Sequence, residues 1–223
     1  MKVVFVGAGN VATLLAIELY RLDFDIVQVY SRTQESADEL AHQVKAIATA
    51  NLSNIIDSAD LYIFSVKDAV LKDVLSQMPH NKGLWIHTAG SLPLSIFEGL
   101  ADRFGVFYPL QTFSKGRDVK WENIPIFVEA SDIESEELLM AIAKQISEKV
   151  AILSSDLRQY VHLTGVFACN FVNHMYALSA EVLKKANLPF DVALPLIDET
   201  ASKVYEMSPQ EAQPVLLSGM TKM

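Results

Sequence analysis

The sequence predicts an α/β protein in which a doubly wound, mostly parallel sheet is followed by a small all-α C-terminal domain. The chain opens with a strand, a glycine-rich turn, a helix and a second strand. Short apolar runs then alternate with helical patterns as far as residue 152, as expected of a sheet covered by helices on both faces. After residue 153 the pattern is helical only. We therefore expect domains at residues 1–153 and 154–223.

The elements are predicted from apolar runs and helical periodicity. After the opening unit, the strands are expected near 46–48 and at 60–66, 84–87, 106–108, 126–128 and 150–152, and the helices at 34–44, 52–58, 69–77, 93–100 and 133–147.

The opening residues 2–33 are typical of a dinucleotide-binding βαβ unit. The apolar strand at 3–6 leads into Gly7, Gly9 and Ala12, which have the spacing G-x-G-x-x-A. We expect Gly7 to allow the tight turn, Gly9 to let a pyrophosphate approach the backbone, and Ala12 to let helix and strand pack closely. The free N–H groups near Asn10 and Val11 would then face the anion. The alternative is an incidental glycine-rich turn, but the flanking strands and helix favour binding.

The end of the second strand predicts which cofactor binds. An NAD site needs an acidic side chain there to accept the ribose 2′-hydroxyl, whereas Asp23 and Asp25 both precede this strand. Ser31, Arg32 and Thr33 stand at its end instead, and this combination suits a 2′-phosphate. The sequence thus favours NADP, unless Arg32 is simply a solvated loop residue.

Ligands of such sheets bind beyond the carboxyl ends of the strands. After the strand at 60–66 we expect Val66, Lys67 and Asp68 to flank the nicotinamide ribose. His87 ends the next predicted strand and is a candidate catalytic group. A histidine that is merely hydrogen-bonded at a strand end explains the same pattern.

Composition limits the classes of partner. The net charge of −9 argues against nucleic acid and anionic membrane surfaces. The uncharged run at 3–17 is interrupted by Gly7 and Gly9 and is too short to span a bilayer, so we expect no export or membrane segment. The single cysteine, Cys169, fits a reducing cytoplasm, and the scattered histidines predict no metal site.

The C-terminal part predicts a long helix at about 156–186, a second at 190–206 and a short third one from about Ser208. The long helix is apolar on two sides, so we expect one side to meet the sheet domain and the other a second subunit. Asn170 and Asn173 lie three residues apart and are candidate groups for holding a substrate. Buried hydrogen bonds across a dimer interface are the alternative. Cys169 is expected to be a small core residue.

Together these residues give the chain a resemblance to the pyrroline-5-carboxylate reductase-like NADP-dependent oxidoreductases, with a Rossmann domain and a helical C-terminal domain of unassigned function. The residues that carry the resemblance are 7–12, 31–32, 66–68, 87–90, 108–113, 169–171 and 194–197. It implies that NADP(H) binds between the domains and that a homodimer forms through the C-terminal helices. The group usually has Ser where Ala89 stands and His where Tyr108 stands, so neither position is carried over as catalytic. These relatives also tend to have a further segment after Gln213.

The function expected is hydride transfer, to or from a small C=O or C=N substrate held between the domains, by a cytoplasmic NADP-dependent enzyme. His87, Asn170 and Asn173 are the candidate groups for proton donation or substrate polarisation. Two alternatives remain open, a pyrroline-5-carboxylate reductase proper and a non-catalytic NADP-sensing module.

Overall fold

The computed structural model describes residues 1–212, and the chain divides into two compact units, Met1–Val166 and Phe167–Met223. The domain boundary predicted from the sequence, between residues 153 and 154, falls at the end of the sheet rather than at this division. It stays a prediction. The two units are described separately below.

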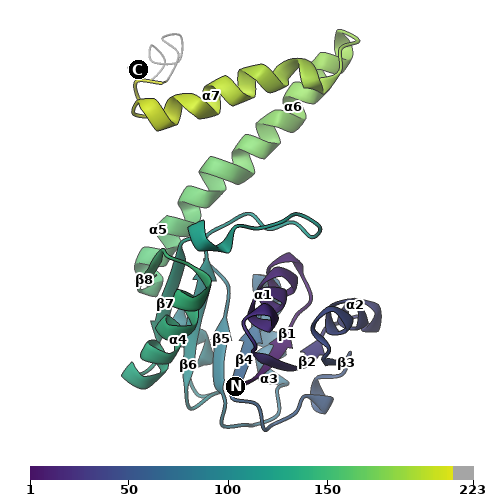
Figure 1. Cartoon of the computed structure of the whole chain (residues 1–223), viewed down its shortest axis with the longest axis vertical. Coiled ribbons are helices and arrows are strands. Elements are labelled where there is room, and N and C mark those ends of the chain that lie inside the picture. The colour runs from purple at the N-terminus through teal and green to yellow at the C-terminus, as the bar shows by residue number, and fades with distance from the viewer. Residues whose placement is uncertain (213–223) are drawn as a thin grey trace. The chain divides into compact units, whose positions relative to one another are not determined.

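The first unit is built on one eight-stranded sheet with the strand order β3-β2-β1-β4-β5-β6-β7-β8. All neighbouring strands are parallel except β6 and β7. Figure 1 labels the elements. The strands are β1 (Lys2–Val6), β2 (Asp25–Tyr30), β3 (Ile47–Thr49), β4 (Leu61–Phe64), β5 (Leu84–His87), β6 (Phe104–Pro109), β7 (Ile126–Ala130) and β8 (Val150–Ile152). The doubly wound, mostly parallel sheet predicted from the sequence is confirmed.

Two hydrophobic cores cover the two faces of this sheet. Alternate residues of β1 point to opposite sides, so Val3 and Phe5 join one core while Val4 and Val6 join the other. The first core is closed by α1 (Asn10–Arg21), α2 (Gln34–Val44) and α4 (Ile133–Ile146), and the second by α3 (Asp68–Ser76) with the segment around Phe97. Strand β1 is paired with β2 on one side and β4 on the other, so the order of strands reverses at β1. Such a switch point is where ligands of this architecture bind.

Two predicted helices are shorter than expected. The segment predicted as helix at 52–58 is a single 3₁₀ turn, Leu52–Asn54. The buried side chain of Gln28 donates to the carbonyl oxygen of Asn54 and accepts from the N–H of Ile56, so these backbone groups are unavailable to a longer helix. The segment predicted at 93–100 is likewise one 3₁₀ turn, Leu94–Phe97, followed by Gly99 with a φ of 74°.

The long C-terminal helix is interrupted. Residues Ser155–Gly165 (α5) and Val172–Lys185 (α6) are α-helical as predicted, but Val166–Phe171 between them form a π-helix. In the second unit a 3₁₀ turn, Phe190–Ala193, precedes α7 (Leu194–Glu206). None of the residues of α6 and α7 is buried. Most of the predicted last helix lies outside residues 1–212, and the segment expected after Gln213 lies wholly outside them.

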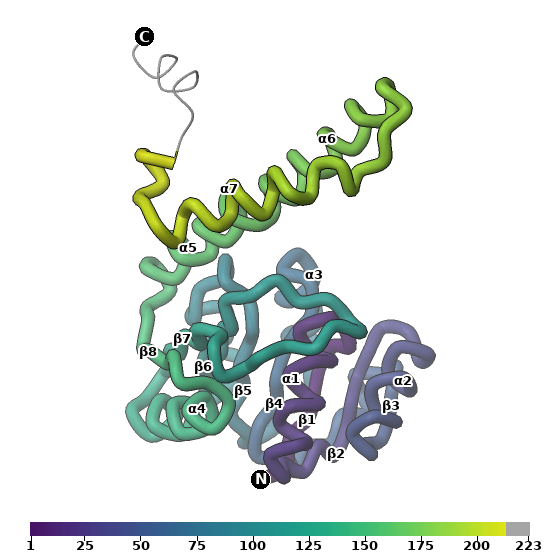
Figure 2. Tube along the Cα trace, turned by 45° about the horizontal axis from the view of Figure 1, so that its top comes forward, coloured from purple at the N-terminus to yellow at the C-terminus, as the bar shows by residue number. Residues whose placement is uncertain are grey.

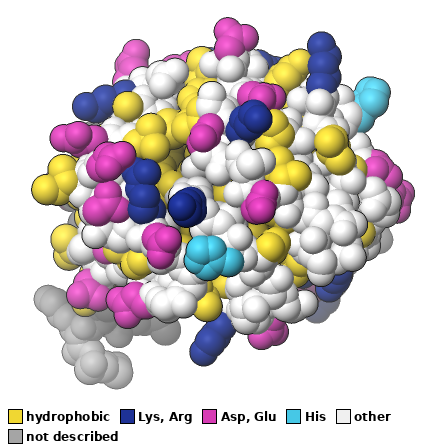
Figure 3. Space-filling model, turned by 90° about the horizontal axis from the view of Figure 1, so that it is seen from below, with side chains coloured by type: hydrophobic (Ala, Val, Ile, Leu, Met, Phe, Trp, Pro, Cys, Tyr) yellow, Lys and Arg dark blue, Asp and Glu magenta, His cyan; other side chains and the backbone are white. Residues whose placement is uncertain are grey.

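One face of the molecule can be compared with the charge balance of the sequence. On the face shown in Figure 3, basic side chains stand among acidic ones and do not gather into a patch. This face therefore lacks the basic footprint that nucleic acid requires. Within residues 1–212, no helix combines the length and the apolar character needed to cross a membrane.

The first prediction compares the two glycines of the turn after β1. Gly7 has a φ of 128°, and a Cβ at this position would lie 2.2 Å from the carbonyl oxygen of Ser65. We expect Gly7→Ala to lower the free energy of unfolding by about 3 kcal/mol or more, because both the backbone angle and the contact are unfavourable.

Gly9→Ala is the matched control, because a Cβ at Gly9 would meet nothing within 4 Å. Its free energy of unfolding should stay within about 1 kcal/mol of the wild type. Urea denaturation measures both variants. Equal stability of the two variants would contradict the assigned role of Gly7.

Candidate functional site

The turn between β1 and α1 is held tightly on one side and is open on the other. The N–H of Gly7 donates to the carbonyl oxygen of Tyr30 at 2.8 Å, and the residue lies against the backbone of Ser65. Gly9 is the N-cap residue of α1 and faces open space. Ala12 is fully buried, as expected for the small residue where the helix packs on the sheet. Gly7 and Ala12 thus occupy the tight turn and the helix–sheet contact that the spacing predicts, whereas the approach of a pyrophosphate to Gly9 stays a prediction.

The start of α1 is suited to an anion. The first N–H groups of a helix have no partner within the helix and carry partial positive charge. No side chain of residues 1–212 caps this terminus, and its first turn contains no acidic residue. The N–H groups of Asn10 and Val11 therefore remain available to a phosphate group.

Ser31, Arg32 and Thr33 follow β2 at the same edge of the sheet. The N–H of Ser31 donates to the carbonyl oxygen of Thr49, and the hydroxyl of Thr33 donates to that of Ser36. Arg32 is exposed, and among the described residues its guanidinium has no hydrogen bond or ion pair. An exposed, uncompensated guanidinium between two hydroxyl side chains has the chemistry required by a phosphate monoester.

A row of polar side chains continues along this edge. The hydroxyl of Thr88, after β5, donates to that of Ser65, after β4, at 3.0 Å. Ser91 donates to the carboxylate of Asp68 at the start of α3. Val66 is half-buried and Lys67 is exposed, so both lie at the surface of this edge.

The loop between β6 and β7 passes over the start of α1, as Figure 2 shows. The side chain of Asn10 donates to the carbonyl oxygen of Phe113 at 2.9 Å. Further along, Lys115 forms an ion pair of 3.0 Å with Glu39 of α2. These contacts attach the loop to the glycine-rich turn and to the neighbouring helix.

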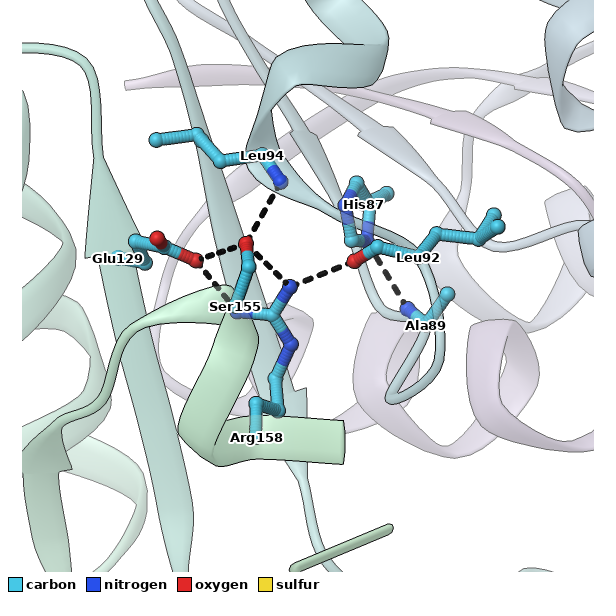
Figure 4. A network of polar contacts seen from close by, with 7 residues as sticks. All are labelled: His87, Ala89, Leu92, Leu94, Glu129, Ser155 and Arg158. Atoms are coloured by element: carbon cyan, nitrogen blue, oxygen red, sulfur yellow. Dashed lines mark hydrogen bonds and ion pairs between the residues drawn. The ribbon is translucent and has the colours of Figure 1, made fainter. Parts of the chain in front are cut away.

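A buried arginine attaches α5 to the sheet (Figure 4). The guanidinium of Arg158 is paired at 2.6 Å with Glu129 of β7 and donates at 2.6 Å to the carbonyl oxygen of Leu92. The hydroxyl of Ser155 donates to the same carboxylate and accepts from the N–H of Leu94. Burial raises the pKa of Glu129, but the hydrogen bonds from Ser155 and Arg158 outweigh it, and the net shift is downward.

His87 is enclosed next to this arginine. Its side chain is 0% exposed and stacks on Phe97. Its Nδ1 accepts from the N–H of Ala89, and its Nε2 has no hydrogen-bond partner among the described residues. Burial, and then the charge of Arg158, lower its pKa to about 4, so the ring is neutral at pH 7. This environment is that of the hydrogen-bonded strand-end histidine weighed as the alternative, and the catalytic role of His87 stays a prediction.

The structure also brings together two residues that the sequence analysis did not propose. The hydroxyl of Tyr108 lies 3.0 Å from Nδ1 of His162 of α5. The resemblance does not carry Tyr108 over as a catalytic group, since similar proteins usually have His at its position, and His162 lies within the predicted long helix without a motif around it. The position of Tyr108 at the carboxyl end of its strand was the available signal, since loops at that edge carry the ligand site.

Asn170 and Asn173 belong to the second unit. Asn170 lies in the π-helix and Asn173 in the first turn of α6, and both are exposed. Cys169 is half-buried and free, rather than enclosed in a core. Within residues 1–212, no three His, Cys, Asp or Glu side chains are grouped as a metal site would require.

The fold is of the Rossmann type, an architecture that binds dinucleotides at this edge of the sheet. Residues 2–87 match the family model described as NADP oxidoreductase coenzyme F420-dependent, and residues 124–215 match a domain of unknown function, DUF2520. A Bacteroides fragilis protein described as a "putative NADP oxidoreductase" is 52% identical, with 96% of this chain and 83% of that chain covered and a TM-score of 0.88. The chain belongs to this family of NADP oxidoreductases.

More distant structures share the fold alone. A pyrroline-5-carboxylate reductase from Streptococcus pyogenes has a TM-score of 0.68 at 18% identity, with 100% of this chain and 90% of that chain covered. A reductive aminase from Aspergillus terreus, solved with an NADPH ligand, has a TM-score of 0.66 at 16% identity, with 92% and 73% covered. A comparison with curated proteins gave no match.

The second prediction concerns the pH dependence of stability caused by His87. The unfolded chain binds a proton at the ordinary value of 6.5 and the folded chain only at about 4. Between these values the unfolded state binds more protons, so stability is present above pH 6.5 and is lost as the pH falls. The wild type loses free energy of unfolding between about pH 7 and pH 4.5. We expect this loss to be smaller by roughly 2–3 kcal/mol in His87→Asn, because asparagine cannot titrate.

Urea unfolding at both pH values measures this difference, and His42→Gln is the control, since His42 is exposed on α2. The same acid loss in wild type and His87→Asn would contradict the assignment.

Proposed function

We propose that the chain is an NADP(H)-dependent oxidoreductase that transfers hydride to or from a small C=O or C=N substrate. The observation that carries the proposal is the turn after β1, where Gly9 faces open space at an uncapped helix start. A diphosphate fits such a start because it needs close approach to backbone N–H groups and no competing carboxylate. Membership of a family of NADP oxidoreductases supports the same function.

Different residues bind the different parts of the cofactor in this proposal. Gly7 sets the turn, and Gly9, Asn10 and Val11 hold the diphosphate. Ser31, Arg32 and Thr33 hold the 2′-phosphate, and Val66, Lys67 and Asp68 flank the nicotinamide ribose. The nicotinamide supplies or accepts the hydride when bound, whereas the protein orients the two reactants and excludes water.

The catalytic assignments of His87, Asn170 and Asn173 stay predictions with different support. His87 is fully buried and neutral at pH 7, which favours a structural role. Asn170 and Asn173 have exposed side chains whose amide groups have no hydrogen-bond partner among residues 1–212, as a substrate-holding pair requires. That the substrate binds between the two domains is also a prediction.

We also propose that the chain forms a homodimer through its C-terminal helices. Large apolar side chains of the second unit are exposed, among them Phe167 at 58%, Leu196 at 69% and Val182 at 65%. Apolar surface of this extent marks an interaction site. A second copy is the proposed occupant, because α6 and α7 bury none of their own residues.

The third prediction is that the purified protein consumes NADPH with a small carbonyl or imine substrate. Stopped-flow absorbance of NADPH, with a panel of cyclic imines, ketones and pyrroline-5-carboxylate, measures it. Consumption with pyrroline-5-carboxylate above all others would identify the alternative reductase. Tight binding of NADPH without consumption of any substrate would instead identify a non-catalytic NADP-sensing module.

The fourth prediction concerns the choice of cofactor. Arg32→Ala should weaken NADPH binding by about 10–100-fold, because charge-assisted hydrogen bonds contribute roughly 1.5–3 kcal/mol. NADH binding should be unchanged, since NADH has no 2′-phosphate. Fluorescence titration measures both affinities.

Arg21→Ala is the control for the Arg32 variant, because Arg21 is exposed in the last turn of α1, away from the uncapped start. Its affinity for both cofactors should equal that of the wild type. Tighter binding of NADH than of NADPH by the wild type would overturn the assignment.

A further inference from the structure

Tyr108 and His162 form a hydrogen-bonded pair in the first unit. The phenol oxygen lies 3.0 Å from Nδ1 of the imidazole, and the two rings meet edge to face with centroids 6.0 Å apart. Gly90 packs against both rings. A Cβ there would lie 2.5 Å from His162 Nδ1 and 2.7 Å from Tyr108 Cζ. Only a glycine leaves room for this contact.

The imidazole of this pair lines a cavity. The cavity has a volume of about 600 Å³ and is lined by His162 with Ser91, Asp156, Gln159, Tyr160 and Leu163. Tyr108 is only 8% exposed, whereas His162 is half-buried. Ser91 also donates to Asp68, one of the residues proposed to flank the nicotinamide ribose. The cavity therefore adjoins the edge of the sheet where the reaction is proposed to occur.

We propose that His162 is the proton donor of the reduction and that Tyr108 is a positioning residue that holds its ring. The proposal rests on the hydride transfer proposed above. The substrate carbon takes the hydride, and the electron pair of the C=O or neutral C=N bond moves to oxygen or nitrogen. That atom takes the proton from Nε2 of the His162 imidazolium. The ring is left neutral and is protonated again from water in the cavity.

Tyr108 can keep this contact in both states of the ring. Its hydroxyl oxygen accepts from Nδ1–H of the imidazolium, and its O–H donates to Nδ1 when only Nε2 carries a proton. Burial raises the pKa of Tyr108 to about 12, so the phenol keeps its proton at neutral pH. A phenol this weakly acidic is a poor proton donor near pH 7, which leaves the imidazole as the acid.

Other titratable groups surround the pair. Asp68 of α3 and Arg158 of α5 both act on the hydroxyl of Tyr108 through their charges, with opposite effects. Asp156 lines the same cavity as His162. His87 lies outside this set of cavity residues and is fully buried, so it does not reach a substrate in the cavity.

The test uses NADPH with 2-methyl-1-pyrroline and cyclohexanone as probes. We expect His162→Gln to lower kcat by about 100-fold or more, and Tyr108→Phe by about 10-fold, because general acids contribute roughly 10²–10⁴ in rate. NADPH affinity, measured by fluorescence titration, should not change. His80→Gln and Tyr20→Phe are the matched controls and should keep the wild-type kcat.

Two measurements use the native fold. The kcat of the wild type should fall with rising pH over the range in which NMR shows the His162 ring losing its proton. In Tyr108→Phe, the pH profile of kcat and the NMR titration of the His162 ring should shift together. Cyclohexanone added to the protein saturated with NADP⁺ should also shift the His162 ring resonances. An activity curve that does not follow the ring would overturn the proposal.

The outcomes separate the two claims. Full turnover in a folded His162→Gln would overturn the role of His162 and leave the hydride transfer intact. If cyclohexanone shifts the His162 ring resonances of the NADP⁺-saturated protein but neither probe nor the wider panel is consumed with NADPH, the reaction is overturned and His162 is supported as part of a ligand site. If neither ring shifts nor consumption of NADPH is observed, both claims are overturned.

Discussion

The position of α5, and with it that of His162, depends on one buried guanidinium. Arg158 lies with 0% of its surface exposed, where an unpaired charge is strongly unfavourable. Glu129, Ser155 and the carbonyl oxygen of Leu92 pair with its two terminal nitrogens and offset most of this cost, whereas its buried Nε has no partner among the described residues. Such a pair adds little net stability compared with apolar packing, but any other position of α5 leaves the charge without partners. Because His162 follows Arg158 by four residues, the same contact places its imidazole on the same side of the helix.

The order of the strands brings the remaining groups to the same edge. Strands β1, β4, β5 and β6 are parallel neighbours, so the residues that follow them all leave the sheet at one edge. The glycine-rich turn, Ser65, Thr88 and Tyr108 occupy this edge in that order. Hydrogen bonds connect several of them, and the backbone of Ser65 touches Gly7. The residues proposed to bind the cofactor and the proposed proton donor thus all belong to the first unit.

Local patterns predicted most of the fold, and they also gave the glycine-rich turn and the residues proposed to bind the cofactor. The strand at 84–87 and the helix at 34–44 have the predicted bounds, because periodicity reports conformation and burial within a few residues. Such local patterns do not predict contacts between residues far apart in the sequence. Gln28 shortens the turn at Leu52–Asn54 from 26 residues away, and Tyr108 meets His162 across 54 residues. Neither pairing leaves a local signal, since each depends on how whole elements pack.

Binding of an anionic cofactor by a chain with a net charge of −9 requires local compensation. Two acidic residues near the proposed cofactor site are already engaged. Asp68 accepts from Ser91, and Glu39 is paired with Lys115. Arg32 has no such partner among the described residues, and the first turn of α1 contains no acidic residue. Because the potential at short range is set by adjacent groups rather than by the total charge, this edge can attract phosphate groups while the protein as a whole is acidic.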